Sequence, residues 1–338
     1  MTLPETSRFP FAADLRICRI LNGMWQVSGA HGAIDPARAV AAMDAYHDAG
    51  FTTWDLADHY GPAEDLIGSF RRQFARRHGA LRLPEIQAFT KWVPSPGMMT
   101  RPVVEAAIGV SLRRMGVDRL DLLQFHWWDY QDRRYLDALR HLADLRDAGK
   151  IRHLALTNFD TERLAIIIEA GIPIVSNQVQ YSLVDRRPAA KMAAFCSGHA
   201  VTLLTYGTLL GGLLSEKYLG CPEPGRAELP TASLQKYKQM IDAWGGWALF
   251  QELLAALKRV ADKHGVSIAN AGTRYILDRP AVAGVIVGAR LGVAEHIADN
   301  TRTFDLTLDA EDRAAIEPVL AKSRDLMRII GDCGDEYR

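Results

Sequence analysis

Residues 120–179 read LDLLQFHWWDYQDRRYLDALRHLADLRDAGKIRHLALTNFDTERLAIIIEAGIPIVSNQV. Short apolar or β-branched runs alternate in this stretch with segments of helical periodicity. The runs are 120–126, 151–157 and 174–179, and the helical segments are 133–148 and 162–170. Such alternation is typical of parallel strands joined by helical crossovers, so the stretch predicts a βαβαβ arrangement.

The same pattern extends in both directions along the chain. Further predicted strands are 17–24, 51–56, 86–91, 201–206 and 282–287, and further predicted helices include 36–49, 102–115 and 247–264. Asp35 and Asp160 precede helical segments as expected of N-caps, and Gly116 stands where a helix should stop. Eight strand–helix units in series favour a closed (β/α)8 TIM barrel.

An open, doubly wound sheet is the competing α/β architecture. Its dinucleotide-binding versions carry a GxGxxG turn after the first strand. No two glycines in this chain stand two residues apart, so that fingerprint is absent. We therefore expect a single barrel domain over 1–338, with its core at about 15–322 and a Gly/Pro-rich loop insertion, a candidate lid, at 211–246.

Composition narrows the class of protein and of partner. Of 338 residues, 48% are hydrophobic, which suits a globular protein with a large core. Forty basic residues balance forty acidic ones, so we expect neither nucleic-acid nor membrane binding. The four cysteines form no ligand spacing, so no metal is expected. The expectation is a cytoplasmic monomer or weak homo-oligomer that acts on a small molecule.

Ionisable side chains are concentrated at the carboxyl ends of three consecutive predicted strands. Asp55 ends the second strand, with Tyr60 five residues later, Lys91 ends the third and His126 ends the fourth. In a parallel barrel these ends converge on one mouth. Read separately, each would be an ordinary surface or core residue, but their joint placement indicates proton-transfer chemistry.

These four residue types have complementary roles in proton transfer. A tyrosine has a pKa of about 10, and a neighbouring ammonium such as that of Lys91 would lower it. Asp55 would keep that lysine charged despite desolvation. His126 would hydrogen-bond the substrate oxygen and orient the carbonyl.

The segments DLADHYG at 55–61, FTKW at 89–92 and LLQFHW at 122–127 resemble, in order and position, the catalytic tetrad segments of the aldo-keto reductase family. The resemblance covers roughly 20–300. It implies reversible, NADPH-dependent reduction of an aldehyde or ketone to an alcohol, with Tyr60 as the general acid. NADH remains a possible cofactor.

The resemblance also implies a set of cofactor-binding positions. The nicotinamide-binding segments of the family resemble TNF at 157–159 and NQVQYS at 177–182, and its pyrophosphate-binding segment, here called the pyrophosphate segment, resembles TYGTLLGGLLSEKY at 205–218. Its adenosine-binding segment, here called the adenosine segment, resembles IVGARLGVAEHIADN at 286–300, where a guanidinium would pair with a 2′-phosphate. The implied residues are Thr157, Asn158, Gln178, Tyr206, Gly207, Thr208, Leu209, Gly211, Leu213, Lys217, Gly288, Ala289, Arg290, His296, Asp299 and Asn300.

Four tryptophans follow or lie at predicted strand ends and are candidates for an apolar substrate wall. They are Trp25, Trp92, Trp127 and Trp128, and packing within the barrel is the alternative for each.

Two other functions remain open on sequence. One is a cofactor-binding regulatory subunit with little turnover, since some relatives of the family serve channels in that way. The other is a barrel lyase or isomerase that uses Lys91 to form an imine.

Overall fold

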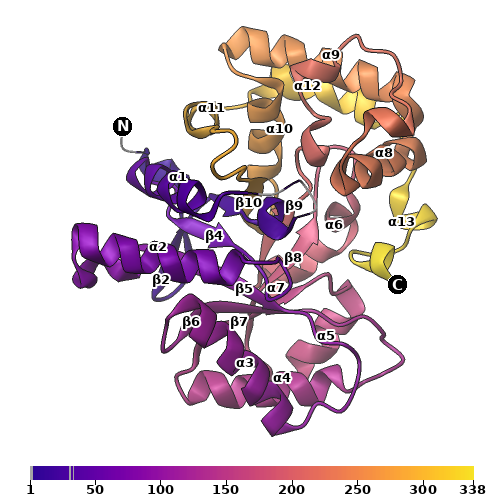
Figure 1. Cartoon of the computed structure of the whole chain (residues 1–338). Helices are drawn as coiled ribbons and strands as arrows, with labels where there is room; N and C mark the ends of the chain where they lie inside the picture. The colour runs from indigo at the N-terminus through magenta and orange to yellow at the C-terminus, as the bar shows by residue number, and fades with distance from the viewer. Residues whose placement is uncertain (1–2, 30–31, 33) are drawn as a thin grey trace.

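The computed structural model describes residues 3–29, 32 and 34–338. Within these residues, eight parallel strands form a closed barrel with helices around it (Figure 1). In pairing order the strands are β10 (Val282–Gly288), β3 (Ile20–Gly23), β4 (Thr53–Asp55), β5 (Gln87–Trp92), β6 (Leu120–Phe125), β7 (Ile151–Thr157), β8 (Ile174–Gln180) and β9 (Thr202–Tyr206). β9 pairs in turn with β10, so the predicted (β/α)8 barrel is confirmed.

The helices pack on the outside of the barrel, and their apolar faces share one large core with the strands. They are α1 (Pro36–Asp48), α2 (Ala63–His78), α3 (Arg101–Met115), α4 (Tyr135–Asp147), α5 (Thr161–Glu169), α6 (Arg187–Ala190), α7 (Met192–Gly198), α8 (Ala232–Trp244), α9 (Gly246–His264), α10 (Ile268–Leu277), α11 (Ile297–Arg302), α12 (Ala310–Leu320) and α13 (Leu326–Ile329).

The local signals act as predicted at several helix ends. The Asp35 carboxylate accepts hydrogen bonds from the Ala37 and Arg38 amides at the start of α1. Asp160 caps α5 through the Arg163 amide. Gly116 follows α3 with a φ of 65°, a left-handed conformation that glycine adopts without a Cβ clash.

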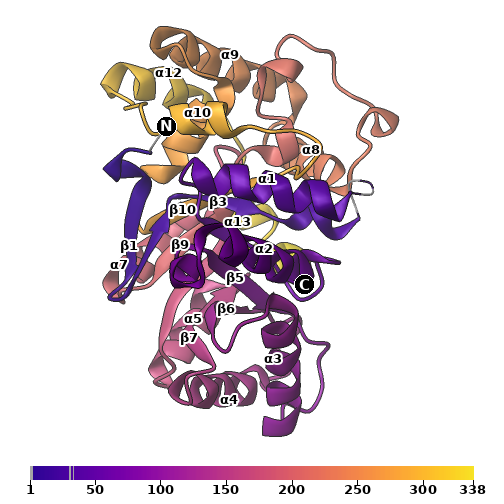
Figure 2. The ribbon, with the colours of Figure 1, turned by 60° about the vertical axis from the view of Figure 1, so that its left-hand side comes forward.

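An antiparallel hairpin closes the amino-terminal end of the barrel (Figure 2). It consists of β1 (Arg8–Ala12) and β2 (Leu15–Cys18), and its Phe11, Leu15 and Ile17 pack on the inner residues of the barrel. The prediction of one strand over 17–24 was wrong here. The chain leaves the strand conformation at Arg19, whose guanidinium donates to the carbonyls of Leu277 and Val282. The apolar run predicted as one strand is thus divided between β2 and β3, and it reads as continuous because both strands are buried.

Two predicted boundaries also differ from the structure. The insertion at 211–246 is not a loop throughout, since α8 occupies its second half with Thr231 as its N-cap. The chain after 322 is not peripheral, because Leu326 and Cys333 are buried. Both segments return to the barrel.

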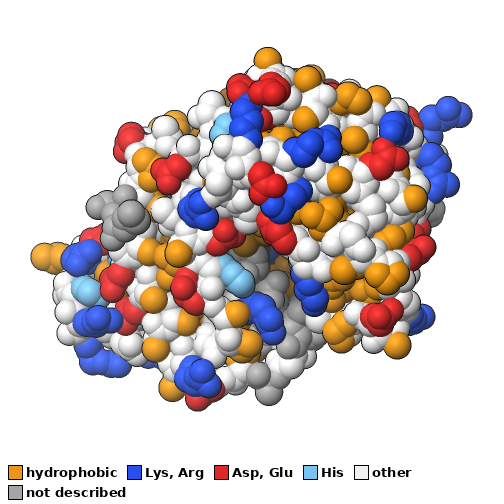
Figure 3. Space-filling view, turned by 90° about the horizontal axis from the view of Figure 1, so that it is seen from above, with side chains coloured by type: hydrophobic (Ala, Val, Ile, Leu, Met, Phe, Trp, Pro, Cys, Tyr) orange, Lys and Arg blue, Asp and Glu red, His pale blue; other side chains and the backbone are white. Residues whose placement is uncertain are grey.

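No helix in the described part of the chain combines the length and the apolar character needed to cross a bilayer. On the face drawn in Figure 3, acidic and basic side chains are interspersed around a hollow near the middle.

Candidate active site

The barrel interior changes from apolar to polar toward its carboxyl end. Side chains alternate between the two faces of a strand, so residues two apart point the same way. The lower inward layer includes Phe89, Leu122, Ala155 and Leu204. Two residues further along the same strands stand Lys91, Gln124, Thr157 and Tyr206. This polar layer, with Asp55 from β4 and Gln178 from β8, forms the floor of one mouth.

Asp55 and Lys91 form a buried ion pair at that floor. The Lys91 Nζ lies 2.7 Å from Asp55 Oδ2 and donates to the Leu56 carbonyl at 3.0 Å. Both side chains are nearly inaccessible to solvent. Burial lowers the pKa of Lys91, and the Asp55 carboxylate opposes that change. The pairing predicted between these two residues is therefore present.

Two glutamine amides hold the other oxygen of the same carboxylate. Asp55 Oδ1 accepts from Gln178 Nε2 at 2.6 Å and from Gln124 Nε2 at 3.0 Å. Gln178 Nε2 also donates to Gln124 Oε1 at 2.7 Å, which closes the ring of bonds. Sequence reasoning missed Gln124, although its position two residues before His126 places it on the same inward face.

Tyr60 stands over the ion pair. Lys91 Nζ is 5.0 Å from the centre of the Tyr60 ring, and Trp25 meets that ring edge-on with centroids 5.0 Å apart. Burial raises the pKa of the Tyr60 phenol well above its usual value, and the Asp55 charge adds to the rise. In the protein alone, burial and the neighbouring negative charges outweigh the lowering of this pKa that was expected from Lys91. The phenol keeps its proton.

His126 is buried beside the mouth with one ring nitrogen engaged. Its Nδ1 lies 3.1 Å from the Thr157 carbonyl oxygen. Its Nε2 is buried and has no hydrogen-bond partner among the described residues. Burial lowers the pKa of His126 to about 4, and the positive charge of Arg338 acts in the same direction. The imidazole is therefore neutral.

The four residues implied for the nicotinamide come together next to this tetrad. Thr157 pairs with Gln178 across β7 and β8, and the Thr157 hydroxyl faces the Gln178 carbonyl at 3.4 Å. Asn158 follows with a φ of 59°. Its Oδ1 accepts from the Tyr206 phenol at 2.8 Å.

The pyrophosphate segment is a tight turn against α8. Tyr237 packs so closely on Gly207 that a Cβ there would lie 2.6 Å from the phenol oxygen. Leu213 does not fit its implied role, because its side chain is fully buried and its amide donates to the Leu210 carbonyl at 3.2 Å. The Thr208 hydroxyl is also engaged, with the Tyr181 carbonyl at 2.8 Å.

The remaining residues of that turn are more accessible. Gly211 and Lys217 are exposed, and Leu209 is partly buried. The Lys217 Nζ lies 5.2 Å from the centre of the Tyr218 ring.

The adenosine segment is only partly available to a ligand. Arg290 and His296 are exposed, and Arg290 lines a small pocket with Gln26. The Gln26 side chain packs on Gly288, and Ala289 is buried.

Two residues implied for the adenine are used within the protein. The Asp299 carboxylate accepts from the Ser267 hydroxyl at 3.1 Å at the start of α10. Asn300 is buried. This part of the adenosine segment therefore packs against the start of α10.

Residues 332–338, the C-terminal segment, lie across the same mouth, a feature that sequence reasoning missed. The Tyr206 and Tyr337 hydroxyl oxygens lie 3.1 Å apart, and Arg338 donates to the Asn158 carbonyl at 2.8 Å. Glu336 pairs with the buried Arg187 at 3.0 Å. The segment therefore contacts the positions implied for the nicotinamide.

The four tryptophans divide into two pairs. Trp128 is 41% exposed and meets the His126 ring edge-on at 4.3 Å, and Trp25 contacts Tyr60, so both border the mouth. Trp127 is fully buried and its Nε1 donates to the Asp129 carbonyl at 2.7 Å. Trp92 is also buried, against Phe125. Trp127 and Trp92 are core residues, contrary to the substrate-wall prediction.

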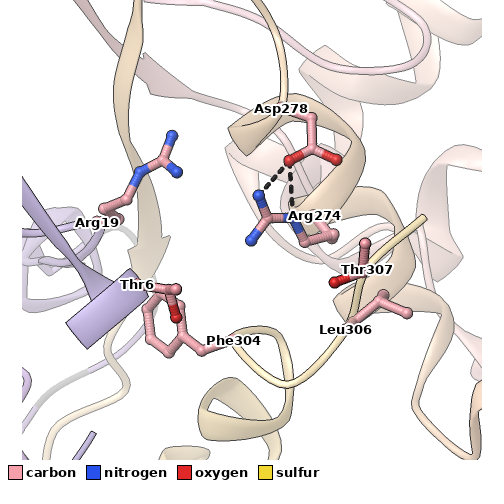
Figure 4. Close-up of a pocket in the computed structure, with 7 residues that line it drawn as sticks. All are labelled: Thr6, Arg19, Arg274, Asp278, Phe304, Leu306 and Thr307. Carbon is pink, nitrogen blue, oxygen red and sulfur yellow. Dashed lines mark hydrogen bonds and ion pairs between the residues drawn. The ribbon is translucent and has the colours of Figure 1, made fainter. Parts of the chain in front are cut away.

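A separate cavity of about 320 Å³ lies away from this mouth (Figure 4). Arg19, which borders it, precedes β3, and Asp278 follows α10, so the cavity is at the amino-terminal end of the barrel. Its charged groups are used internally, since Arg274 is paired with Asp278. The functional mouth of a parallel barrel is the opposite end.

The chain resembles known proteins over nearly the whole barrel. The model of the aldo/keto reductase family matches residues 19–321. The chain is 30% identical over 260 residues to flagellar radial spoke protein 5 of Chlamydomonas reinhardtii, covering 66% of the chain but only 49% of that protein. It is 26% identical over 311 residues to the aldo-keto reductase YhdN of Bacillus subtilis, covering 89% of each.

A solved structure shares the fold. The aldo/keto reductase from Klebsiella pneumoniae, in complex with NADP and acetate, superposes with a TM-score of 0.70 at 22% identity, covering 93% of this chain and 95% of that one. With the family model matching nearly all of the barrel, this chain belongs to the aldo/keto reductase family.

Proposed function

We propose that this protein reduces an aldehyde or ketone to an alcohol with NADPH, and that Tyr60 is the proton donor. The observation that carries the proposal is the meeting of Tyr60, Lys91, Asp55 and His126 at the carboxyl end of the barrel, with the Asp55–Lys91 pair at 2.7 Å. Titratable groups with opposed pKa shifts that meet in one site are typical of acid–base catalysis.

The residues around the tetrad suit a nicotinamide dinucleotide. Thr157, Asn158 and Gln178 offer hydroxyl and amide groups to a carboxamide, and Tyr206 offers an aromatic face. Exposed Arg290 suits a 2′-phosphate. The NADP-bound relative supports this choice of cofactor. When bound, NADPH would supply the hydride.

The side chains of the protein would supply position and charge. As negative charge develops on the carbonyl oxygen of the substrate, the neutral Tyr60 phenol would transfer its proton to that oxygen. Lys91, 5.0 Å from the ring centre, stabilises the phenolate that remains. Asp55 keeps the ammonium charged. Alcohol oxidation is the same path reversed.

Replacement of one hydroxyl tests this assignment. Tyr60→Phe is expected to bind NADPH with unchanged affinity, measured by quenching of tryptophan fluorescence, and to lose most turnover of a carbonyl panel. Tyr275→Phe is the matched control, because that phenol bonds Glu317 at 2.6 Å, away from the mouth. Undiminished turnover by Tyr60→Phe would refute the proposal.

A cofactor-binding subunit with little turnover is the second candidate. The observation in its favour is the 30% identity to flagellar radial spoke protein 5, whose name refers to a structural assembly and not to a reaction. Tight NADPH binding with no turnover of any aldehyde or ketone would support it. A lyase that forms an imine on Lys91 fits less well, since the amine is held as an ammonium between Asp55 and the Leu56 carbonyl.

A further inference from the structure

The cavity of about 320 Å³ at the amino-terminal end of the barrel takes no part in the proposed reaction (Figure 4). Its walls come from segments that are far apart in the chain. Arg19 precedes β3, Arg274 lies in α10, and Thr307 lies between α11 and α12. Cavities of this volume are large enough for small-molecule ligands. The groups that line it therefore indicate what kind of molecule it suits.

The Arg19 guanidinium is only partly satisfied by the protein. Its Nε donates to the Ala283 carbonyl at 3.3 Å, and its Nη2 donates to the Leu277 and Val282 carbonyls at 2.6 and 3.0 Å. A guanidinium has five N–H groups, and these bonds use three of them. The two on Nη1 have no partner among the described residues. The side chain is thus held in place with one nitrogen left over.

Arg274 offers a second guanidinium nitrogen to the same cavity. Its Nε donates to Asp278 Oδ1 at 2.9 Å, and its Nη2 bonds the same oxygen. Its Nη1 has no partner among the described residues. The pairing with Asp278 therefore uses one side of this guanidinium and leaves the other side for a ligand.

Positive charge around the cavity exceeds negative charge. Asp278 also pairs with Arg313, at 3.1 Å, so one carboxylate serves two guanidinium groups. Arg19 has no carboxylate within ion-pair distance among the described residues. Burial lowers the pKa of Arg19, and the repulsion by Arg274 lowers it further, by more than Asp278 raises it. An anion between the two arginines would remove that repulsion.

The other lining groups suit the two parts of an organic phosphate. Figure 4 shows the Thr307 hydroxyl directed toward the same space, and the Thr6 hydroxyl also borders it. Phe304 and Leu306 supply an apolar side. The Phe304 ring is fixed from behind by Phe51, with centroids 6.4 Å apart. Hydroxyl groups can donate to an oxyanion, and the apolar side can cover a hydrocarbon body.

We propose that this cavity binds a phosphate monoester of a small apolar molecule. The phosphate would lie between Arg19 and Arg274, and the body would pack on Phe304 and Leu306. A phosphate monoester carries close to two negative charges near neutral pH and has three terminal oxygens. Three arginines against one aspartate leave a matching excess of positive charge, and the guanidinium and hydroxyl groups are donors enough for three oxygens.

A carboxylate fits the cavity less well. It has one charge and two oxygens, so it would leave part of the excess charge and some of the donors unmatched. The inference does not rest on the proposed reductase function, because the mouth with the tetrad is at the opposite end of the barrel.

Calorimetric titration of the whole protein with phenyl phosphate tests the proposal. Saturating NADPH is present in one series and absent in another, so that binding at the mouth is recognised by competition. We expect one site whose affinity is the same in both series. Arg274→Leu should weaken binding about 10-fold or more, because it removes a hydrogen bond to a charged group, and Thr307→Val about 3-fold. Thermal melting confirms that each variant is folded, and Thr307 is exposed, so its replacement spares the core.

A neighbouring arginine gives the matched control. Arg279 follows the same helix and stacks on the Tyr275 ring at 4.1 Å, and it does not line the cavity. Arg279→Leu is therefore expected to bind phenyl phosphate as the unsubstituted protein does. An equal loss in Arg279→Leu and Arg274→Leu would mean that only the general positive charge matters, which contradicts a built site.

Three further probes identify the chemistry of the ligand. Phenyl phosphate should bind more tightly than inorganic phosphate, which lacks the apolar body, than benzoate, which lacks charge and one oxygen, and than benzyl alcohol, which has no charge. Absence of phenyl phosphate binding, its displacement by NADPH, or unchanged affinity in both cavity variants would overturn the proposal. Tighter binding of benzoate than of phenyl phosphate would overturn the assignment to a phosphate.

Discussion

Replacement of Gln124 by leucine probes the amide ring that holds Asp55. Leucine has nearly the volume of glutamine but no polar atoms. The change removes the 3.0 Å bond to Asp55 Oδ1 and the acceptor of the 2.7 Å bond from Gln178. Gln124 is fully buried, so water does not replace the lost donor. The Asp55 carboxylate is then held by one amide in place of two.

The size of the effect follows from the bond that is lost. A hydrogen bond to a charged group contributes about 1.5–3 kcal/mol, which corresponds to a decrease of about 10- to 150-fold in kcat/KM if the loss is felt in the transition state. A less constrained Asp55 also opposes the lowering of the Lys91 pKa less strongly. Since lysine is charged below its pKa, the alkaline limb of the pH–rate profile should move to lower pH.

The assay is steady-state reduction at saturating NADPH across pH, with thermal melting to confirm folding. Gln87→Leu is the matched control, because Gln87 begins β5 at the amino-terminal end and bonds Thr53 and the Arg16 carbonyl there. A kcat/KM within twofold of the unsubstituted protein, with the alkaline limb unmoved, would refute the role given to Gln124.

Three further outcomes are expected. Arg187→Met should lower the free energy of unfolding by about 3–5 kcal/mol in urea titrations, because it leaves the buried Asp185 carboxylate without its cation; an unchanged midpoint would contradict this. Glu336→Gln should tighten NADPH binding about 5-fold in fluorescence titrations, because loss of the ion pair with Arg187 loosens the C-terminal segment and frees Asn158. Weaker binding would mean that the segment helps to hold the cofactor. Arg290→Ala should weaken NADPH binding about 5- to 10-fold and leave NADH binding unchanged, and equal weakening of both would place Arg290 away from the 2′-phosphate.

The barrel and the positions of the tetrad could be predicted from the sequence because both depend on local regularities. Strand and helix periods alternate, and β7 begins and ends at the predicted residues, Ile151 and Thr157. Asp55, Lys91 and His126 lie at strand ends, and parallel strands bring such ends to one mouth whatever the loops do.

Other features depend on contacts between distant segments, and only the tertiary structure decides them. Gln178 bonds Asp55 across 123 residues, and Arg338 reaches Asn158 across 180. Trp127 and Trp128 are adjacent in sequence, but Trp127 is fully buried and Trp128 is 41% exposed. The hydrogen-bond partner of His126 Nδ1 is the Thr157 carbonyl, which comes from the next strand of the barrel. Residue type and spacing determine which groups reach the mouth, whereas donor and acceptor roles there depend on orientation, which the packing of the whole barrel sets.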